Sequence, residues 1–145
     1  ATDSVSRVIR DGWQPPTMQA QLAQKIGGLS VEQVLRGDVL ICRLENQTAR
    51  VKLYGAVCPE PHEPGGAEAL AFTRDFIAGK TVELRCRDLG DGSPLVCELL
   101  ANNESLSRAL LSGGHAWWDR ATAPGDTAMQ GLAEEARSAK RGMWH

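Results

Sequence analysis

The chain has 145 residues, of which 42% are hydrophobic, and its 16 Lys and Arg residues against 18 Asp and Glu residues give a formal net charge of -2. This length suits one domain with a hydrophobic core, and the chain is too apolar to be disordered. No apolar run approaches the roughly 20 residues that a membrane span requires, and the charge balance argues against a strongly basic, non-specific nucleic-acid binder.

Residues 1–33 differ in pattern from the rest and are expected to form an N-terminal extension. Thr17 can cap a short helix in which Met18, Leu22 and Ile26 are spaced by four residues, with Gly27-Gly28 at its end. Such an apolar stripe packs on the parent domain or serves a partner. The first residues, Ala-Thr-Asp, would suit a secreted protein after signal cleavage and equally a shortened chain.

From Val34 onward, short apolar runs predict strands, and apolar residues spaced by three or four predict helices. The expected elements are strands at 39–42 and 51–54, a Pro/Gly-rich loop at 59–66, a helix at 67–78, strands at 81–86 and 95–100, and helices at 106–112 and 126–140. Asp126 is the expected N-cap of the last helix. This order predicts an α+β domain over residues 34–145 with a small β-barrel.

The four cysteines, Cys42, Cys58, Cys86 and Cys97, form no CxxC pair, which argues against a zinc ribbon or a thioredoxin-type redox site. Cys86 and Cys97 lie on two predicted strands that a turn-rich segment connects. Two cysteines across a hairpin can come close enough for a disulfide, and the alternative is two buried free thiols. Cys42 and Cys58 show no such local pattern.

Several motifs in the second part of the chain occur together in one order. They are Gly37-Asp38, Val51-Lys52-Leu53-Tyr54-Gly55 followed by Pro59-Glu60, the helix segment from Gly65 to Thr73, Leu106 to Ala116, and Ala136 to Trp144. In this order they resemble the staphylococcal-nuclease (thermonuclease-like) family. The resemblance implies a five-stranded OB-type barrel with three helices, and calcium-dependent cleavage of phosphodiester bonds in DNA and RNA. Some secreted relatives are similar in carrying a cysteine pair on the same hairpin, which implies a Cys86–Cys97 disulfide and a secreted or periplasmic protein.

Three positions agree with the site that the resemblance implies. Asp38 matches an aspartate that binds the metal, a hard cation that prefers oxygen ligands. Glu60 matches the glutamate that acts as general base on the attacking water. Cys58 matches the residue whose main-chain carbonyl contacts the metal, and any residue can supply that group.

Three other positions depart from the family pattern. Val57 replaces the second metal-binding aspartate, Lys52 replaces the first phosphate-binding arginine, and Ser93 replaces the second. Lysine keeps the charge but lacks the bidentate fork of arginine, whereas serine loses the charge. Since removing one charge-stabilising donor costs roughly 10²–10³ in rate, we expect weak or absent catalysis by Asp38, Lys52 and Glu60. With one direct carboxylate left, calcium affinity is expected to fall sharply.

Neighbouring residues offer replacements for the lost groups. Arg50, Arg85 and Arg87 are the candidate arginines, and His62 and Glu63 are candidate ligands just after Glu60. For each of them, an exposed strand or loop charge is the better interpretation. Cys58 and His62 at a spacing of four would suit a soft metal only in helical geometry, which a Pro-rich loop disfavours. Asp38 and Glu60 also have a structural interpretation, as a turn former and a loop charge.

The tryptophan pair Trp117-Trp118 follows the second predicted helix. These indoles can stack on bases or sugars, or one can lie in the core while the other packs beneath the third helix. Trp144 matches a core tryptophan of the family and is expected to be structural.

Three functions compete. The first is a nuclease-fold binding or interaction module that has lost, or nearly lost, catalysis. The second is a working metal-dependent nuclease with a rearranged site built on Asp38, Lys52 and Glu60. The third is an OB-type domain that binds a glycan or a protein partner through its tryptophans or its N-terminal segment. Nucleic acid is expected to bind weakly because there is no positive excess.

Overall fold

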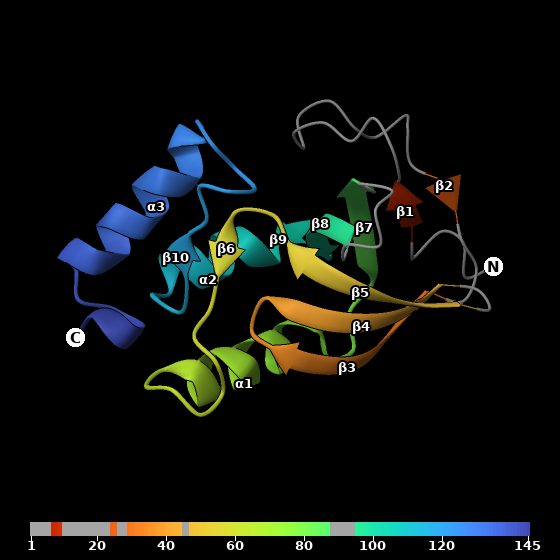
Figure 1. Cartoon of the computed structure of the whole chain (residues 1–145), viewed down its shortest axis with the longest axis horizontal. Helices are drawn as coiled ribbons and strands as arrows, with labels where there is room; N and C mark the ends of the chain where they lie inside the picture. The colour runs from red at the N-terminus through yellow and green to blue at the C-terminus, as the bar shows by residue number, and fades with distance from the viewer. Residues whose placement is uncertain (1–6, 10–23, 26–28, 45–46, 88–94) are drawn as a thin grey trace.

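The computed structural model describes residues 7–9, 24–25, 29–44, 47–87 and 95–145 (Figure 1). Its elements are β1 (Arg7–Ile9), β2 (Gln24–Lys25), β3 (Ser30–Arg36), β4 (Val39–Leu44), β5 (Gln47–Leu53), β6 (Ala56–Val57), α1 (Gly66–Ile77), β7 (Val82–Arg87), β8 (Leu95–Ala101), β9 (Glu104–Ser105), α2 (Leu106–Ser112), β10 (Trp117–Trp118), α3 (Thr127–Ser138) and the 3₁₀ turn η4 (Gly142–Trp144). This is the α+β fold that the sequence predicts.

The main sheet has the strand order β2-β1-β7-β8-β5-β4-β3, and β9 pairs with β8. β3, β4 and β5 form an antiparallel meander, β5 then lies parallel to β8, and β7 and β8 form an antiparallel hairpin. A second, two-stranded sheet joins β10 to β6. The parallel step from β5 to β8 is possible because α1 and β7 lie between them in the chain, which supplies the long crossover that parallel pairing requires.

The hydrophobic core lies between this sheet and the helices. Alternate residues of the strands face it, among them Leu40, Leu53, Leu84 and Leu99, all fully buried. α2 contributes Leu106, Leu110 and Leu111 and packs on β8 and α3, whereas α1 packs on β3 (Figure 1).

The three predicted helices agree with the structure to within two residues at each end. α3 begins as predicted, because the Asp126 side chain accepts a hydrogen bond from the main-chain nitrogen of Met129 at 3.1 Å. α2 is capped in the same way by Ser105, which accepts from the nitrogen of Arg108. Capping satisfies main-chain donors that have no partner inside the helix, so these two positions fix where the helices start.

The N-terminal extension differs from the expected pattern. β3 starts at Ser30, four residues before the predicted change to strands, because its pairing with β4 extends to Ser30↔Arg43. The helix expected after Thr17 lies mainly outside the described residues, and the two described residues within it, Gln24–Lys25, form β2. β2 pairs with β1, and β1 lies parallel to β7 at Val8↔Leu84, so the extension adds strands to the sheet.

The hairpin of β7 and β8 carries the disulfide that the resemblance implied. Cys86 and Cys97 are directly opposite in the strand register, with their Cα atoms 4.0 Å apart and their sulfurs bonded. Cys42 and Cys58 are free and buried. Burial raises the pKa of the Cys42 thiol to about 12 and also raises that of Cys58, so both remain neutral thiols inside the core.

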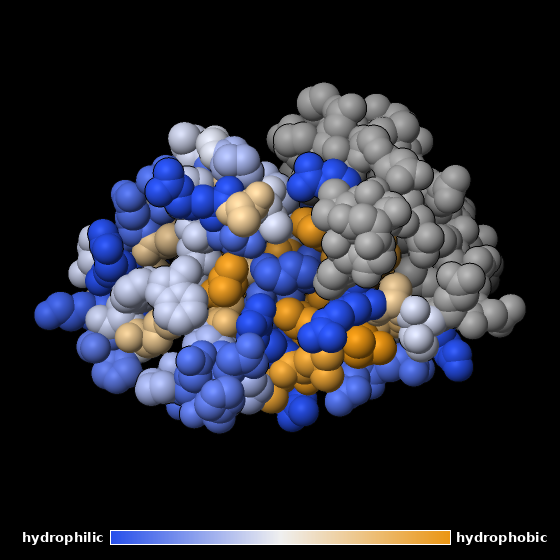
Figure 2. Space-filling view, in the orientation of Figure 1, coloured by the Kyte–Doolittle hydropathy of each residue, from blue (hydrophilic) through white to orange (hydrophobic). Residues whose placement is uncertain are grey.

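Apolar and polar residues are unevenly distributed over the visible surface. Figure 2 shows hydrophobic residues gathered over β3 and β4, whereas the surface of α3 is mainly hydrophilic. Val31 of β3 packs against the core while remaining partly exposed. Within the described ranges, no helix has the length and hydrophobicity to cross a membrane.

Candidate functional site

Asp38 lies in the tight turn between β3 and β4. Its carboxylate is fully buried. The Leu53 nitrogen donates to its main-chain carbonyl at 2.9 Å, and the Thr73 hydroxyl of α1 donates to the carbonyl of Gly37 at 2.6 Å. The turn is therefore fixed to β5 on one side and to α1 on the other.

Arg36 binds Asp38 through a two-pronged ion pair. Its Nε lies 2.6 Å from Oδ1 of Asp38, and its Nη2 lies 3.0 Å from Oδ2. The hydrogen bond to Asp38 is the main cause that raises the pKa of Arg36 above its ordinary value. The remaining Nη1 donates to Oε2 of Glu60 at 2.9 Å. One guanidinium thus joins the two carboxylates that the resemblance assigned to the metal and to the general base.

Lys52 supplies a second cation to the same carboxylate. Its Nζ lies 3.1 Å from Oδ2 of Asp38 and 3.4 Å from Oδ2 of Asp119. It also donates to the main-chain carbonyls of Leu53 at 3.0 Å and Ala56 at 2.8 Å. Four oxygens therefore surround the ammonium group. Oxygen is also the ligand atom that metal cations such as calcium prefer.

Glu60 lies beside this centre in a loop, with its side chain about half exposed. Its nitrogen donates to Oε1 of Glu63 at 2.8 Å, and the nitrogen of Glu63 donates to the carbonyl of Glu60 at 2.9 Å. Gly66 is required here, because a Cβ at that position would lie 1.7 Å from the carbonyl oxygen of Glu60. The two hydrogen bonds between Glu60 and Glu63 stabilise the loop. His62 is exposed to solvent.

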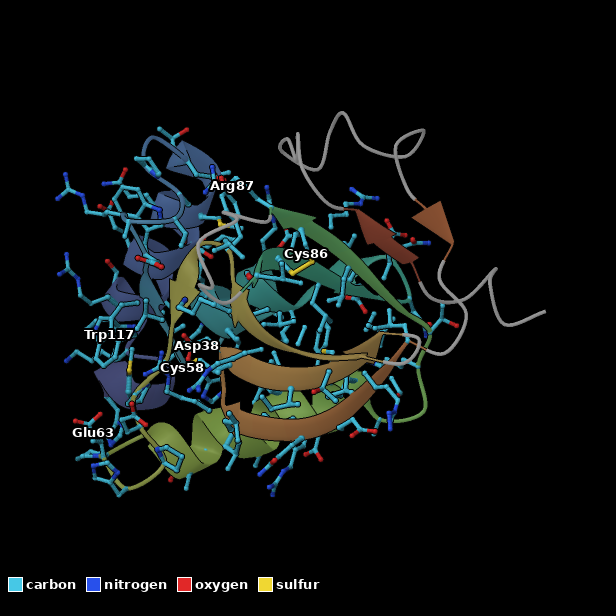
Figure 3. All side chains as sticks on the ribbon, turned by 45° about the vertical axis from the view of Figure 1, so that its right-hand side comes forward. Asp38, Cys58, Glu63, Cys86, Arg87 and Trp117 are labelled. Atoms are coloured by element: carbon cyan, nitrogen blue, oxygen red, sulfur yellow. A yellow bond between two sulfur atoms is a disulfide. The ribbon has the colours of Figure 1, made fainter. Side chains whose placement is uncertain are left out.

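Cys58 lies next to Asp38, and Val57 precedes it at the end of β6. Val57 pairs across the two-stranded sheet with Trp117 and presents no polar side-chain atom to the centre. The sulfur of Cys58 packs beneath Gly37, where an added Cβ would meet it at 2.7 Å. Figure 3 shows Cys58 next to Asp38, and the negative charge of Asp38 adds to burial in raising the pKa of that thiol.

The candidate replacement arginines do not join the centre. Arg50 is exposed on β5. Arg85 forms an ion pair with Glu83 at 2.7 Å. Arg87 lies apart from Asp38 (Figure 3), and its charge acts instead on Tyr54 near the start of α3. Ser93, where the resemblance places the second arginine, lies outside the described residues.

The residues present do not fit a calcium ion. Both oxygens of Asp38 already accept hydrogen bonds or ion pairs from Arg36 and Lys52, and Val57 cannot act as a ligand. In the part of the chain that the structure describes, no three His, Cys, Asp or Glu side chains are placed to share a metal. This finding applies equally to a soft-metal site at Cys58 and His62.

Two members of the centre, Arg36 and Asp119, were absent from the sequence prediction. Arg36 stands two residues before Asp38, and the tight turn brings both side chains to one side. Asp119 directly follows Trp118 and is brought to Lys52 by the pairing of β10 with β6. The Arg-Gly-Asp turn offered a local signal for the first, whereas only the pairing of distant strands reveals the second.

The tryptophan pair separates into one exposed and one packed indole. Trp117 is 42% exposed and is the one large hydrophobic side chain classed as exposed among the described residues. Trp118 packs against the core, donates its Nε1 hydrogen to the carbonyl of Ala123 at 3.1 Å, and has Arg120 over its ring. Trp144 in η4 is partly buried, and its Nε1 is buried without a hydrogen-bond partner.

Comparison with known proteins shows the family of this chain. A family model described as "Staphylococcal nuclease homologue" matches residues 50–145. Two rice proteins (Oryza sativa subsp. japonica), named "Probable staphylococcal-like nuclease CAN2" and "Probable staphylococcal-like nuclease CAN3", are each 30% identical over 95 residues, which is 66% of this chain. The match spans about a quarter of these relatives, 26% and 25% of their lengths. With two thirds of its length matched to the model, the chain belongs to the staphylococcal nuclease homologue family.

Proposed function

We propose that this domain has lost, or nearly lost, the calcium-dependent phosphodiesterase activity that its family resemblance implies, and that it acts as a binding module. The observation that carries the proposal is the ion-paired state of Asp38. Arg36 and Lys52 neutralise the buried carboxylate from within the protein, so a metal ion would have to displace a guanidinium or an ammonium group.

The chemistry of the remaining groups supports the same conclusion. Glu60 is held by Arg36, which lowers its availability as a proton acceptor for water. Lys52 is engaged by four oxygens, so its hydrogens are not directed at a substrate phosphate. A catalytic site of this kind needs donors that point to where charge develops in the transition state.

Calorimetry with calcium tests the metal part of the proposal. The wild-type protein is expected to show no binding heat at millimolar calcium. A double variant, Arg36→Ser with Val57→Asp, removes one resident cation and adds one carboxylate, and it should bind calcium at least about tenfold more tightly than its control, Arg36→Ser with Val57→Asn. Tight calcium binding by the wild type would overturn the proposal.

A nuclease assay tests the activity directly, and its alternative outcome is a metal-dependent nuclease with a rearranged site. Single-stranded DNA and RNA are incubated with the wild type and with Glu60→Gln in calcium, manganese or magnesium. We expect no cleavage above the background of the variant. Metal-dependent cleavage that disappears in Glu60→Gln would establish the alternative and reject the inactive module.

We also infer that the protein works in an oxidising compartment, secreted or periplasmic. The Cys86–Cys97 disulfide supports this, since structural disulfides persist outside the reducing cytosol. Mass spectrometry of unreduced peptides from the native source should find Cys86 linked to Cys97. Free thiols at both positions would contradict the proposed location.

A further inference from the structure

A groove separate from the Asp38 centre lies between β10, α3 and η4. It has a volume of about 190 Å³ and is open to solvent. Trp117, Trp118, Ala133 and Trp144 give it apolar surface, whereas α3 adds Gln130, Glu134 and Arg137. Because these three polar residues recur at intervals of four and three, they form one stripe along the helix.

The packing of the fold does not explain why the indole of Trp117 is exposed. Trp118 contributes to the core and satisfies its ring nitrogen at Ala123, so the strand is already anchored without its neighbour. Trp117, the preceding residue of β10, keeps 42% of its surface in water. A large rigid aromatic surface beside polar groups is the composition of a small-molecule site.

The polar groups of the groove are available for a ligand. Within the described ranges, no hydrogen bond or ion pair engages the guanidinium of Arg137, and Glu134 has only a long 3.4 Å contact with Gln130. Glu134 and Arg137 are both exposed, so their polar atoms can meet a ligand in the groove.

We propose that this groove binds a neutral carbohydrate, with a sugar ring stacked on Trp117. Amide, carboxylate and guanidinium groups together match hydroxyls that both donate and accept hydrogen bonds. The charges of Glu134 and Arg137 cancel, and the chain carries no positive excess for a phosphate backbone. Arg137 in the lining and Arg120 over Trp118 also disfavour a cationic ligand.

Nuclear magnetic resonance of the indole NH groups tests the site in the full chain. The protein is titrated with hexasaccharides of cellulose, chitin, starch and xylan, and with oligothymidylate. At least one hexasaccharide should shift the NH signals of Trp117 and Trp144 in a saturable way. Trp117→Ala and Glu134→Ala should each weaken that binding about tenfold or more, whereas Glu135→Ala, the neighbouring position that pairs with Arg141, should not.

Thermal melting shows whether each variant still folds. Glu134 is exposed and can be replaced with little effect on folding, so Glu134→Ala keeps the test interpretable if Trp117→Ala lowers the melting temperature. No saturable shift with any of the four sugars, or equal loss in Glu135→Ala, would overturn the proposal. Binding of oligothymidylate at the same signals would assign the groove to nucleic acid and would also reject it. Neither result depends on the calcium or nuclease measurements.

Discussion

At the scale of single residues, Arg36 is the central cation of the site, because it binds one buried and one exposed carboxylate. Asp38 is fully buried, whereas the side chain of Glu60 is 48% exposed. Breaking a buried ion pair leaves an uncompensated charge, whereas an exposed pair contributes little. The two partners of one guanidinium are therefore expected to differ strongly in their effect on stability.

Replacing each carboxylate by its amide tests this difference. Asp38→Asn should lower the free energy of unfolding by about 3 kcal/mol, since Arg36 and Lys52 then lose their shared counter-charge. Glu60→Gln should cost less than about 1 kcal/mol. Urea unfolding of the two variants and the wild type measures both values, and equal losses would contradict the ion-pair network as drawn.

Glu98 is a second buried carboxyl, on β8, and predicts a pH dependence. Burial is the main cause that raises its pKa from 4.5 to about 7, and Asp126 acts in the same direction. Ser105, which donates to Oε1 at 3.1 Å, and the nearby Arg108 and Arg85 act in the opposite direction. Oε2 has no hydrogen-bond partner.

A raised pKa in the folded state means that the folded protein holds this proton more tightly than the unfolded chain. The resulting stability is fully present below pH 4.5 and is lost as pH rises to about 7. Over this window Glu98 should contribute a fall on the order of 3 kcal/mol. Denaturation of wild type and Glu98→Gln across this range should show the fall only in the wild type, and parallel curves would disprove it.

At the scale of elements, the β7–β8 hairpin combines strand pairing with a covalent link. The disulfide joins residues separated by 11 positions. In the chain-entropy model, closing a loop of this size stabilises the folded state by about 3 kcal/mol at most. The hairpin also carries the parallel contact to β5, so its order affects the strand on which Lys52 lies.

Removing the disulfide should therefore destabilise the domain, while β7 and β8 keep their strand pairing. Cys86→Ala with Cys97→Ala should lose about 2–3 kcal/mol of unfolding free energy. The control is Cys42→Ala in the intact background, which leaves a small core cavity but keeps the disulfide, so it should still lose stability on reduction, whereas the double variant should not. Wild-type stability that does not change on reduction would exclude a stabilising disulfide.

At the scale of the whole molecule, the net charge and the local ion pairs both argue for weak nucleic-acid binding. The chain carries -2 overall, and the two cations at the site are matched by Asp38, Asp119 and Glu60. Tight nucleic-acid binding draws on cations that are free to neutralise phosphates. Arg36 and Lys52 are not free in this sense, because both already pair with carboxylates of the protein.

Fluorescence anisotropy with labelled single-stranded DNA at two salt concentrations tests this expectation. At physiological salt the dissociation constant should be weaker than about 10⁻⁴ M, the weak end of non-specific binding. Lys52→Met should change it little, since that ammonium is already engaged by protein oxygens. Micromolar binding with a steep salt dependence would contradict the charge argument.

The sequence predicted the elements of this protein well, because their signals are local. Asp126 marks the start of α3 through a contact three residues away, and the spacing of Leu106 and Leu110 marks the buried side of α2. The short motifs of the family placed Lys52 beside Asp38. The pattern failed at Gln24–Lys25, where pairing with a distant strand gives the backbone its partners.

The sequence by itself determined that Val57 and Lys52 stand at the positions where the family resemblance implies an aspartate and an arginine. Only the tertiary structure decided what fills the gap. Asp119 reaches Lys52 across 67 positions of sequence, and Arg36 reaches Glu60 across 24. Contacts between distant segments depend on strand register and helix packing, which no local pattern encodes, so the tertiary structure alone shows the site neutralised by its own side chains.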